Sequence, residues 1–491
     1  MTLKIFNVLG REKQDFKPIE DGKIGVYVCG PTVYDDAHLG HARSYVSFDL
    51  VIRWLRYSGY NVLYVQNITD VGHLTDDADQ GDDKILKKAA QVQAKPMQIV
   101  ETYTRNYFRD MDLLGVLRPD ISPRASGHIP EQIKMVQTLI DKGHAYEADG
   151  SVYFDVTTDE DYGKLSNRKL EHQEEGTREA VRGEKRNPQD FALWKKAEPN
   201  HILRWDSPWG EGFPGWHIEC SAMSHKYLGK TFDIHGGGID NIFPHNECEI
   251  AQSESANDEP FANYWMLVGT LKVPDPIDGT PTKMGKSLGN FVTIQQALAD
   301  YRPEVIRMFV FSAHYSNPVT YSDDSLEAVQ GAWERLYNAA MLTRQMKTSA
   351  PAGDAGNAFL PQIDKTRADF ATAMNDDFNA PKAIAALQEF TREVNSLLNG
   401  DDPVGVDVLN AIDQVYNDLG GTVLGVIPAG HDEQGGGSAE REGQLIDLLI
   451  QMRADARKNK DFATSDRIRD ELAAAGVVLE DRADGTVWKL T

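Results

Sequence analysis

Cysteine is scarce in this sequence, whose 491 residues include only Cys29, Cys220 and Cys248. An odd number of widely spaced thiols argues against a framework of disulfide bonds. Each thiol taken singly is expected to be a buried structural residue, and a metal ligand or a reactive group is the alternative. The context of each thiol has to decide between these roles.

Long apolar runs are also missing. No run approaches the roughly 18 residues that a membrane span needs, and residues 1–11 lack the apolar core and cleavage site of a signal peptide. We therefore expect a cytoplasmic protein without a membrane partner. Because single cores stop growing at about 250–300 residues, the length predicts several domains.

Positive charge is in short supply. The 51 Lys and Arg residues face 75 Asp and Glu residues, which gives a net charge of −24. Nucleic-acid phosphates require a basic surface, so the total charge argues against an RNA or DNA partner. Any RNA-binding surface would have to be local, in stretches such as residues 178–186 and 453–460.

The pattern of apolar residues predicts an α/β domain with a parallel sheet. Residues 24–29 and 61–67 have the short, β-branched pattern of buried strands, and residues 40–57 between them have helical spacing. A strand, a helix and a strand in this order form a βαβ unit, which is the basis of a Rossmann-like sheet. The strand pattern returns at residues 232–234 and 264–268.

Changes in composition and in the spacing of apolar residues along the chain predict its domain organisation. From residue 303 onward there are helical periods without strands, and the segment after residue 428 is rich in glycine, as flexible linkers are. We expect two halves of a Rossmann-like domain at residues 1–121 and 201–302, an insertion at 122–200, a helical bundle at 303–427, a linker at 428–441 and a small C-terminal domain at 442–491.

Two motifs are suited to polyphosphate chemistry. The first expected strand leads into His38-Leu39-Gly40-His41, and we expect a helix to begin at His41, where backbone N–H groups and the helix dipole attract an anion. Far downstream, Lys283 and Lys286 flank a glycine, and two ammonium groups there could hold a polyphosphate. Either motif alone is weak, because surface histidines and solvated lysine loops are common.

A glycine-rich stretch, residues 235–240, follows an expected strand. Its glycines would let an adenosine approach the backbone, and Asp240 could accept hydrogen bonds from ribose hydroxyls. A tight turn without a ligand is the alternative interpretation.

Four residues have the chemistry of a metal site. Cys29 ends the first expected strand, Cys220 lies in PGWHIECSAMS, and His245 and Glu249 are four residues apart, which places them on one helix face. Two thiolates, an imidazole and a carboxylate would suit tetrahedral zinc. Spacing alone favours cysteines that are simply buried in strands.

Several strings, in order, resemble the cysteinyl-tRNA synthetases, a family of class I aminoacyl-tRNA synthetases. They are YVCGPTVYD, PGWHIECSAMS, HGGGIDNIFPHNECE, KMGKSLGN and the C-terminal DFATSDRIRDELAAAGVVLEDRADGTVWKL. HLGH and KMGKS resemble the HIGH and KMSKS signatures of the class, with Gly285 where the family usually has serine. The resemblance spans almost the whole chain.

The resemblance implies an ATP-dependent enzyme that activates L-cysteine as cysteinyl-adenylate and transfers it to the 3′-terminal adenosine of cysteine tRNA. It implies one Zn²⁺ per chain and Mg²⁺ with ATP, and we expect a monomer. The implied zinc ligands are Cys29, Cys220, His245 and Glu249. Cys248 is left out because it points about 100° away from Glu249 on a helix.

The remaining implied roles follow the matching positions. Catalysis is implied for His38, His41, Lys283 and Lys286, and ATP binding for His38, Gly40, His41, Gly237, Asp240 and Lys286. Cysteine binding is implied for Gly30, Thr69, Trp216 and His235, and anticodon contact for Phe462, Asp466 and Asp481.

Other functions stay open on the sequence. A mycothiol-pathway ligase is similar but joins cysteine to an aminosugar and has a shortened C-terminal region. A catalytically inactive, synthetase-like RNA-binding protein would be expected to lose motif residues, and a nucleotidyltransferase for a small metabolite would not need RNA-binding modules. The intact motifs and the long C-terminal region favour the synthetase.

Overall fold

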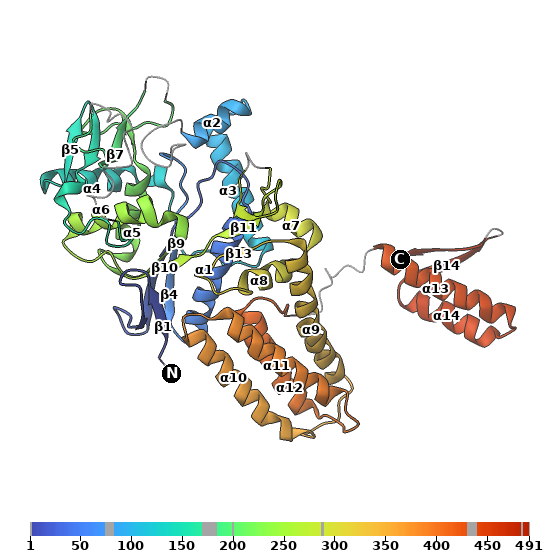
Figure 1. The fold of residues 1–491 in the computed structure, drawn as a ribbon. Coiled ribbons are helices and arrows are strands. Elements are labelled where there is room, and N and C mark those ends of the chain that lie inside the picture. Colours follow the sequence, from blue (N-terminus) through green and yellow to red (C-terminus); the bar gives the residue numbers. More distant parts are fainter. Residues whose placement is uncertain are drawn as a thin grey trace. The chain divides into compact units, whose positions relative to one another are not determined.

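The computed structural model of the protein describes residues 2–73, 83–168, 184–198, 201–285, 289–429, 439–482 and 485–490. These residues form two compact units, Met1–Ile427 and Pro428–Thr491 (Figure 1). Each unit has a hydrophobic core of its own. No helix among the described residues is both long and apolar enough to cross a membrane.

The first unit is built on a parallel sheet of four strands, in the order β10-β9-β3-β4. The strands are Ala262–Val268, Phe232–Gly238, Lys23–Val28 and Asn61–Gln66. The predicted Rossmann-like α/β fold is confirmed. Because the strands are parallel, their carboxyl ends lie at one edge of the sheet, where α/β proteins bind ligands.

Helix α1, Leu39–Tyr57, connects β3 to β4 and completes the predicted βαβ unit. Its buried residues include Val46, Phe48 and Ile52, which belong to the same core as the sheet. Gly236 of β9 allows the strand to approach the helix, because a Cβ there would collide with the Phe48 ring. The sequence and the packing therefore agree on this unit.

An antiparallel sheet, β5-β6-β7-β8, lies in the predicted insertion and extends beyond residue 200. Its strands are Ala145–Ala148, Ser151–Phe154, Phe191–Lys196 and Gly212–Pro214. Strand β7 was not predicted, because its short apolar run lies among polar residues. Helices α4, α5 and α6 of the same unit are Ile129–Asp141, Trp216–Leu228 and Glu247–Asn257.

Further elements of the first unit surround the sheet edge. The hairpin at the N-terminus is β1, Lys4–Asn7, and β2, Glu12–Asp15, and the helices after β4 are α2, Lys84–Gln91, and α3, Pro96–Leu113. A small sheet, β12-β11-β13, consists of Pro281–Lys283, Leu271–Pro274 and Val319–Thr320.

Helices make up most of the region after residue 303, as the sequence predicts, but the expected absence of strands is wrong because β13 lies there, and the first of the helices begins before residue 303. They are α7, Ile294–Asp300, α8, Pro303–Phe311, α9, Asp323–Lys347, α10, Leu360–Asn375, α11, Ala380–Leu398, and α12, Val406–Val415. Buried residues of these helices and of the parallel sheet belong to one continuous core. The sheet and the helical bundle therefore support each other.

The second unit contains two helices and a hairpin, as expected for its sequence. They are α13, Ala439–Lys458, α14, Phe462–Ala474, and the antiparallel strands β14, Val477–Arg482, and β15, Gly485–Leu490. Its small core includes Ile446, Leu472 and Val477.

Candidate functional site

A cavity of about 450 Å³ lies at the carboxyl edge of the parallel sheet. It is lined by most of the residues to which the sequence assigns chemistry. They are Cys29, Gly30, His38, Gly40, His41, Trp216, Cys220, Thr69, Gly237, Asp240, His245 and Lys283. The fold thus brings the histidine motif, the glycine-rich stretch and part of the lysine motif to one place.

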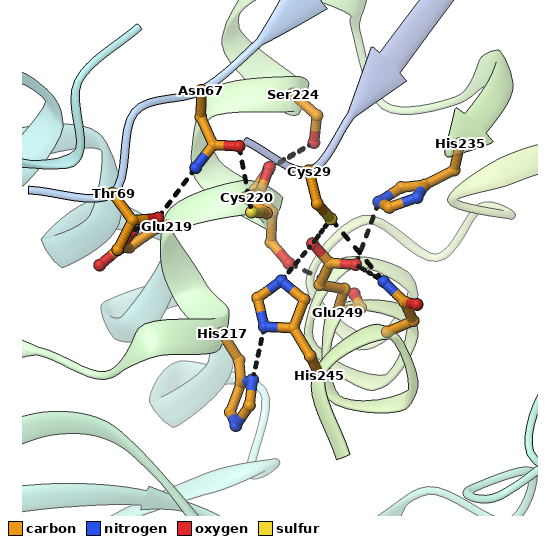
Figure 2. Close-up of polar contacts among 12 residues, drawn as sticks. Cys29, Asn67, Thr69, His217, Glu219, Cys220, Ser224, His235, His245 and Glu249 are labelled. Carbon is orange, nitrogen blue, oxygen red and sulfur yellow. Dashed lines mark hydrogen bonds and ion pairs between the residues drawn. The ribbon is translucent and has the colours of Figure 1, made fainter. Parts of the chain in front are cut away.

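Four buried side chains meet at the base of this site (Figure 2). Cys29 follows β3, Cys220 lies on α5, His245 lies in the turn before α6, and Glu249 lies on the first turn of α6. One ligand atom from each lies within 4.8 Å of the others. The expectation that both cysteines are buried in strands is wrong, because Cys29 lies just after β3 and Cys220 is helical.

The carboxylate of Glu249 is the centre of charge in this cluster. Its Oε1 lies 3.3 Å from His245 Nε2 and 3.8 Å from Cys29 Sγ. Its Oε2 lies 3.0 Å from His235 Nε2 and accepts a hydrogen bond from Asn246 Nδ2 at 2.9 Å. Burial opposes the charged form of Glu249, but the two histidines outweigh burial and hold its pKa well below the usual range.

In contrast to Glu249, the two cysteine ligands have raised pKa values. Burial raises the pKa of Cys220 well above its ordinary value. The hydrogen bond from Cys220 favours the thiolate of Cys29, yet burial and Glu249 together leave the pKa of Cys29 raised. Burial would lower the pKa of His245, but Glu249 and Cys220 raise it to about 10. A bound cation would reverse this balance by releasing the protons.

The donor set fits zinc. Two sulfurs, one imidazole nitrogen and one carboxylate oxygen match the ligands of tetrahedral zinc sites, and all four side chains are buried. His217 Nδ1 lies 3.0 Å from His245 Nδ1, which leaves His245 Nε2 for a metal. Cys248 is outside the cluster, with its Sγ 3.7 Å from the Tyr162 hydroxyl.

Both histidines of the HLGH motif have a fixed tautomer. His38 caps α1, which begins at Leu39 and not at His41 as predicted. The Nδ1 of His38 accepts from the Gly40 N–H at 3.0 Å, and the backbone N–H of His38 donates to His41 Nδ1 at 3.2 Å. Each neutral ring therefore carries its hydrogen on Nε2, where it can donate to a ligand.

The electrostatic surroundings keep the two rings neutral. Burial and the nearby Lys283 lower the pKa of His38 to about 4. Burial and His38 lower the pKa of His41 well below its ordinary value. The two rings are stacked with centroids 3.9 Å apart. A side chain at Gly40 would meet the His38 ring at 2.8 Å, so this position needs glycine.

The lysine motif lies beside the glycine-rich stretch. Lys283 Nζ is 3.2 Å from Asp240 Oδ2, and both side chains are exposed. Asn290 closes the loop, since its Oδ1 accepts from the Gly285 N–H at 2.8 Å and its Nδ2 donates to the Lys283 carbonyl at 3.4 Å. Lys286 lies outside the described residues.

One prediction for the glycine-rich stretch needs correction, and the contact of His235 with cysteine stays a prediction. His235 to Gly238 do not follow a strand, because they are the last residues of β9. His235 is fully buried and is not among the residues that line the cavity; it stacks on Trp265, with ring centroids 4.1 Å apart, and contacts Glu249. A Cβ on Gly237 would lie 3.9 Å from Cys29 Sγ, so this glycine adjoins the metal cluster.

The cavity also contains residues that the sequence analysis missed. Asn67 follows β4 and Thr32 follows β3, and a polar residue just after a parallel strand is a usable signal. His73 stacks on Trp216 with ring centroids 4.0 Å apart, and its Nε2 lies 2.7 Å from Lys84 Nζ. No sequence motif indicated this pair.

The predicted anticodon residues lie in the second unit. Phe462 begins α14 and is 62% exposed. Asp466 Oδ1 accepts from Arg469 Nη1 at 3.0 Å on the same helix. Asp481 lies in β14, and its side chain is outside the described part of the structure.

Three family models match successive parts of the chain. Residues 15–331 match the model for the class I (C) tRNA synthetase catalytic domain. Residues 369–428 match the DALR domain, and residues 444–488 match the cysteinyl-tRNA ligase anticodon binding domain.

Relatives match over their full length. The chain is 51% identical to a protein of Chlorobium luteolum named cysteine–tRNA ligase, covering 100% of both sequences. It is 49% identical to a protein of that name from Deinococcus radiodurans, covering 99% of this chain and 97% of the relative. Among solved structures, methionyl-tRNA synthetase of Mycobacterium tuberculosis with methionyl-adenylate has a TM-score of 0.58 at 16% identity, covering 87% of this chain and 94% of that one, which supports the fold.

Proposed function

The chain belongs to the cysteine–tRNA ligases, the aminoacyl-tRNA synthetases that join cysteine to tRNA, and from this premise we propose how its residues share the work. The aminosugar ligase and the inactive RNA-binding protein are not supported, because the match covers whole cysteine–tRNA ligases and includes their anticodon binding domain.

Cys29, Cys220, His245 and Glu249 hold one zinc ion in this proposal. The observation that carries it is the convergence of four buried donors of the right types within 4.8 Å. When bound, zinc supplies a soft Lewis acid that prefers the sulfur of cysteine to the oxygen of serine. An apolar pocket alone separates such close isosteres poorly, so the metal would account for specificity.

The amino acid occupies the part of the cavity next to these ligands. Gly30, Thr69 and Trp216 form its walls. His235 Nε2 lies 3.0 Å from the carboxylate of Glu249. His235 therefore orients this metal ligand and acts on the pocket through it. The direct contact of His235 with cysteine, which the resemblance implies, stays part of the proposal.

ATP occupies the part of the cavity beside the HLGH motif. His38 and His41 donate from Nε2 to phosphate oxygens, which stabilises the charge that develops during transfer. Gly40 and Gly237 admit the adenosine, and Asp240 accepts from its ribose. Lys283 exchanges its contact with Asp240 for the phosphates, where Lys286 and Mg²⁺ also bind.

The reaction then proceeds in two transfers. The cysteine carboxylate attacks the α-phosphorus of ATP, the bond to the bridging oxygen breaks, and pyrophosphate leaves with the electron pair. A hydroxyl of the tRNA's terminal adenosine next attacks the cysteinyl carbonyl and releases AMP. No protein nucleophile is needed, because positioning and charge stabilisation carry the catalysis.

The RNA partner engages residues 303–427 and the second unit. The exposed ring of Phe462 can stack on an anticodon base, whereas Asp466 and Asp481 supply acceptors for base edges. Asp466 has to exchange its contact with Arg469 for the base. The protein acts as a cytoplasmic monomer in this proposal.

Pyrophosphate exchange with cysteine or serine, before and after treatment with a zinc chelator, tests the proposal. We expect exchange with cysteine only, loss of exchange after zinc removal, and charging of cysteine tRNA by the zinc-loaded protein. Equal exchange with and without zinc would contradict the metal assignment.

A further inference from the structure

Asn67 is a buried residue, 1% exposed, that lies just after β4 at the same edge of the sheet as the metal cluster. Its carboxamide makes hydrogen bonds to two different parts of the site (Figure 2). Oδ1 accepts from the Gly30 N–H at 2.7 Å and from Cys220 Sγ at 3.8 Å. Nδ2 donates to Thr69 Oγ1 at 3.0 Å.

We propose that Asn67 is a positioning residue. It fixes the position of the amino-acid pocket relative to the metal ligands and thereby sets the discrimination of cysteine from serine. The inference rests on the proposed zinc and cysteine sites and adds a residue that neither of them includes.

The side-chain oxygen of Asn67 contacts the sulfur of Cys220 and the backbone N–H of Gly30, the residue that follows Cys29. The N–H that Gly30 donates belongs to the peptide bond between Cys29 and Gly30, so Oδ1 holds the backbone beside one ligand whether or not a metal is bound. The contact with Cys220 Sγ needs the thiol hydrogen, which a bound metal would release. A Cβ on Gly30 would collide with the backbone carbonyl oxygen of Asn67, which means that the segments after β3 and β4 are in direct contact. The carboxamide oxygen therefore fixes the segment after β4 to the backbone that follows Cys29, and this hydrogen bond persists in the zinc-loaded protein.

The hydrogen bond from Asn67 Nδ2 orients the hydroxyl of Thr69 so that it can accept from a donor group of the substrate. Thr69 donates its hydroxyl hydrogen to Glu219 Oε2 at 3.0 Å and accepts from Asn67 Nδ2. A hydroxyl has one hydrogen and two lone pairs, so Thr69, which lines the cavity, keeps one lone pair without a partner among these two contacts. That lone pair suits a donor, and the donor of an amino-acid substrate is its ammonium group.

Asn67 thus connects the contact for the substrate's ammonium group to the contact for its sulfur. Cysteine uses both contacts, and its binding depends on their separation. Serine gains little from the metal, so it depends on the ammonium contact alone. Loss of Asn67 should therefore weaken cysteine more than serine, because misplacement by a fraction of an ångström is enough to disturb a preorganised site.

The test compares full-length, zinc-loaded Asn67→Ala with Asn7→Ala. Asn7 is also a buried asparagine with several hydrogen bonds, and its partners are outside the metal cluster. Zinc affinity is measured by competition with a chromophoric chelator, and pyrophosphate exchange is measured with cysteine and with serine. In Asn67→Ala we expect zinc affinity and the cysteine-to-serine ratio of kcat/KM to fall about 10- to 100-fold, with the KM for ATP unchanged. Asn7→Ala should change neither quantity.

Asn67→Asp tests the hydrogen bonds of the side-chain oxygen and of the side-chain nitrogen separately and keeps the shape of the side chain. It retains an oxygen for the Gly30 N–H but has no donor for Thr69, so we expect zinc to be retained while the KM for cysteine rises. Asn67 would be merely structural if its variants melted earlier but kept wild-type zinc affinity and discrimination. Failure of the wild type to catalyse cysteine-dependent exchange would refute the proposed function, whereas zinc affinity of the variants would still decide the role of Asn67 at the cluster.

Discussion

Cys220 and Cys248 are both fully buried thiols, but they have different neighbours. Cys220 belongs to the four-residue cluster, and Cys248 packs in another core beside Tyr162. We predict that Cys220→Ser loses bound zinc and more than about 100-fold of cysteine-dependent exchange, since even changes to residues that only hydrogen-bond to a metal ligand cost up to that much.

Cys248→Ser is the matched control for this prediction. It changes a thiol of the same burial on the helix that carries Glu249, without removing a ligand. Zinc content measured by atomic absorption should stay at one ion per chain, and exchange should stay near the wild-type rate. Loss of zinc from this variant would place Cys248 in the metal site.

The neutral state of His38 predicts a dependence of stability on pH. Its folded-state pKa is about 4, below the ordinary 6.5, because of burial and Lys283. As the pH falls below 6.5, the unfolded chain takes up a proton that the folded chain refuses until about pH 4, so stability falls across this window.

His38→Asn tests this link. Asparagine can still cap α1 but does not titrate. We expect the melting temperature of the variant to fall less steeply between pH 6.5 and pH 4 than that of the wild type, as measured by calorimetry. Parallel curves for the two proteins would show that His38 does not contribute.

At the scale of elements, Asn290 holds the loop that follows β12. Its two hydrogen bonds, to Gly285 and Lys283, fix the backbone from which Lys283 extends. Asn290→Ala should lower kcat for pyrophosphate exchange about 10-fold, because two hydrogen bonds contribute on the order of 1–3 kcal/mol. The KM for cysteine should not change. Gly285→Ser, which keeps both backbone hydrogen bonds, should have little effect.

A buried ion pair joins the sheet layer to the helices that follow it. Arg307 of α8 donates to Asp49 of α1 at 2.6 Å and to the Leu424 carbonyl at 2.7 Å. Asp49→Ala would leave a buried guanidinium without its carboxylate, which costs about 3–5 kcal/mol. Urea unfolding followed by tryptophan fluorescence measures this loss.

The control for Asp49→Ala is Asp369→Ala, which breaks an exposed pair with Lys365. Exposed pairs contribute little, so its unfolding curve should overlay that of the wild type. If the two variants were equally stable, the pair between α1 and α8 would not hold the elements together.

At the scale of the whole molecule, the second unit has its own core and should be separable from the chemistry. A chain that ends at Ile427 keeps the entire cavity and the metal cluster. We expect it to retain cysteine-dependent pyrophosphate exchange, while tRNA charging falls on the order of 100-fold or more because one of two linked RNA contacts is lost. An equal loss of both activities would contradict this division.

Local sequence determined much of the fold and the chemistry. The apolar periods of residues 24–67 specified β3, α1 and β4, because alternation and helical spacing act over a few residues. The total charge gave the wrong indication about RNA, since binding depends on the local arrangement of groups and not on their sum. Strand β7 was missed because its short apolar run lies among polar residues and its pairing partners, β6 and β8, are distant in the sequence.

The residue types at the metal site were readable from the sequence, but their meeting was decided by tertiary structure. Cys29, Cys220 and Glu249 converge because β9 returns to pair with β3 and brings α5 and α6 to the same edge. Asn67 and the tautomers of His38 and His41 follow from hydrogen bonds made only in the folded chain. Sequence determines which groups are available, whereas long-range packing sets the distances and burial that give those groups their chemistry.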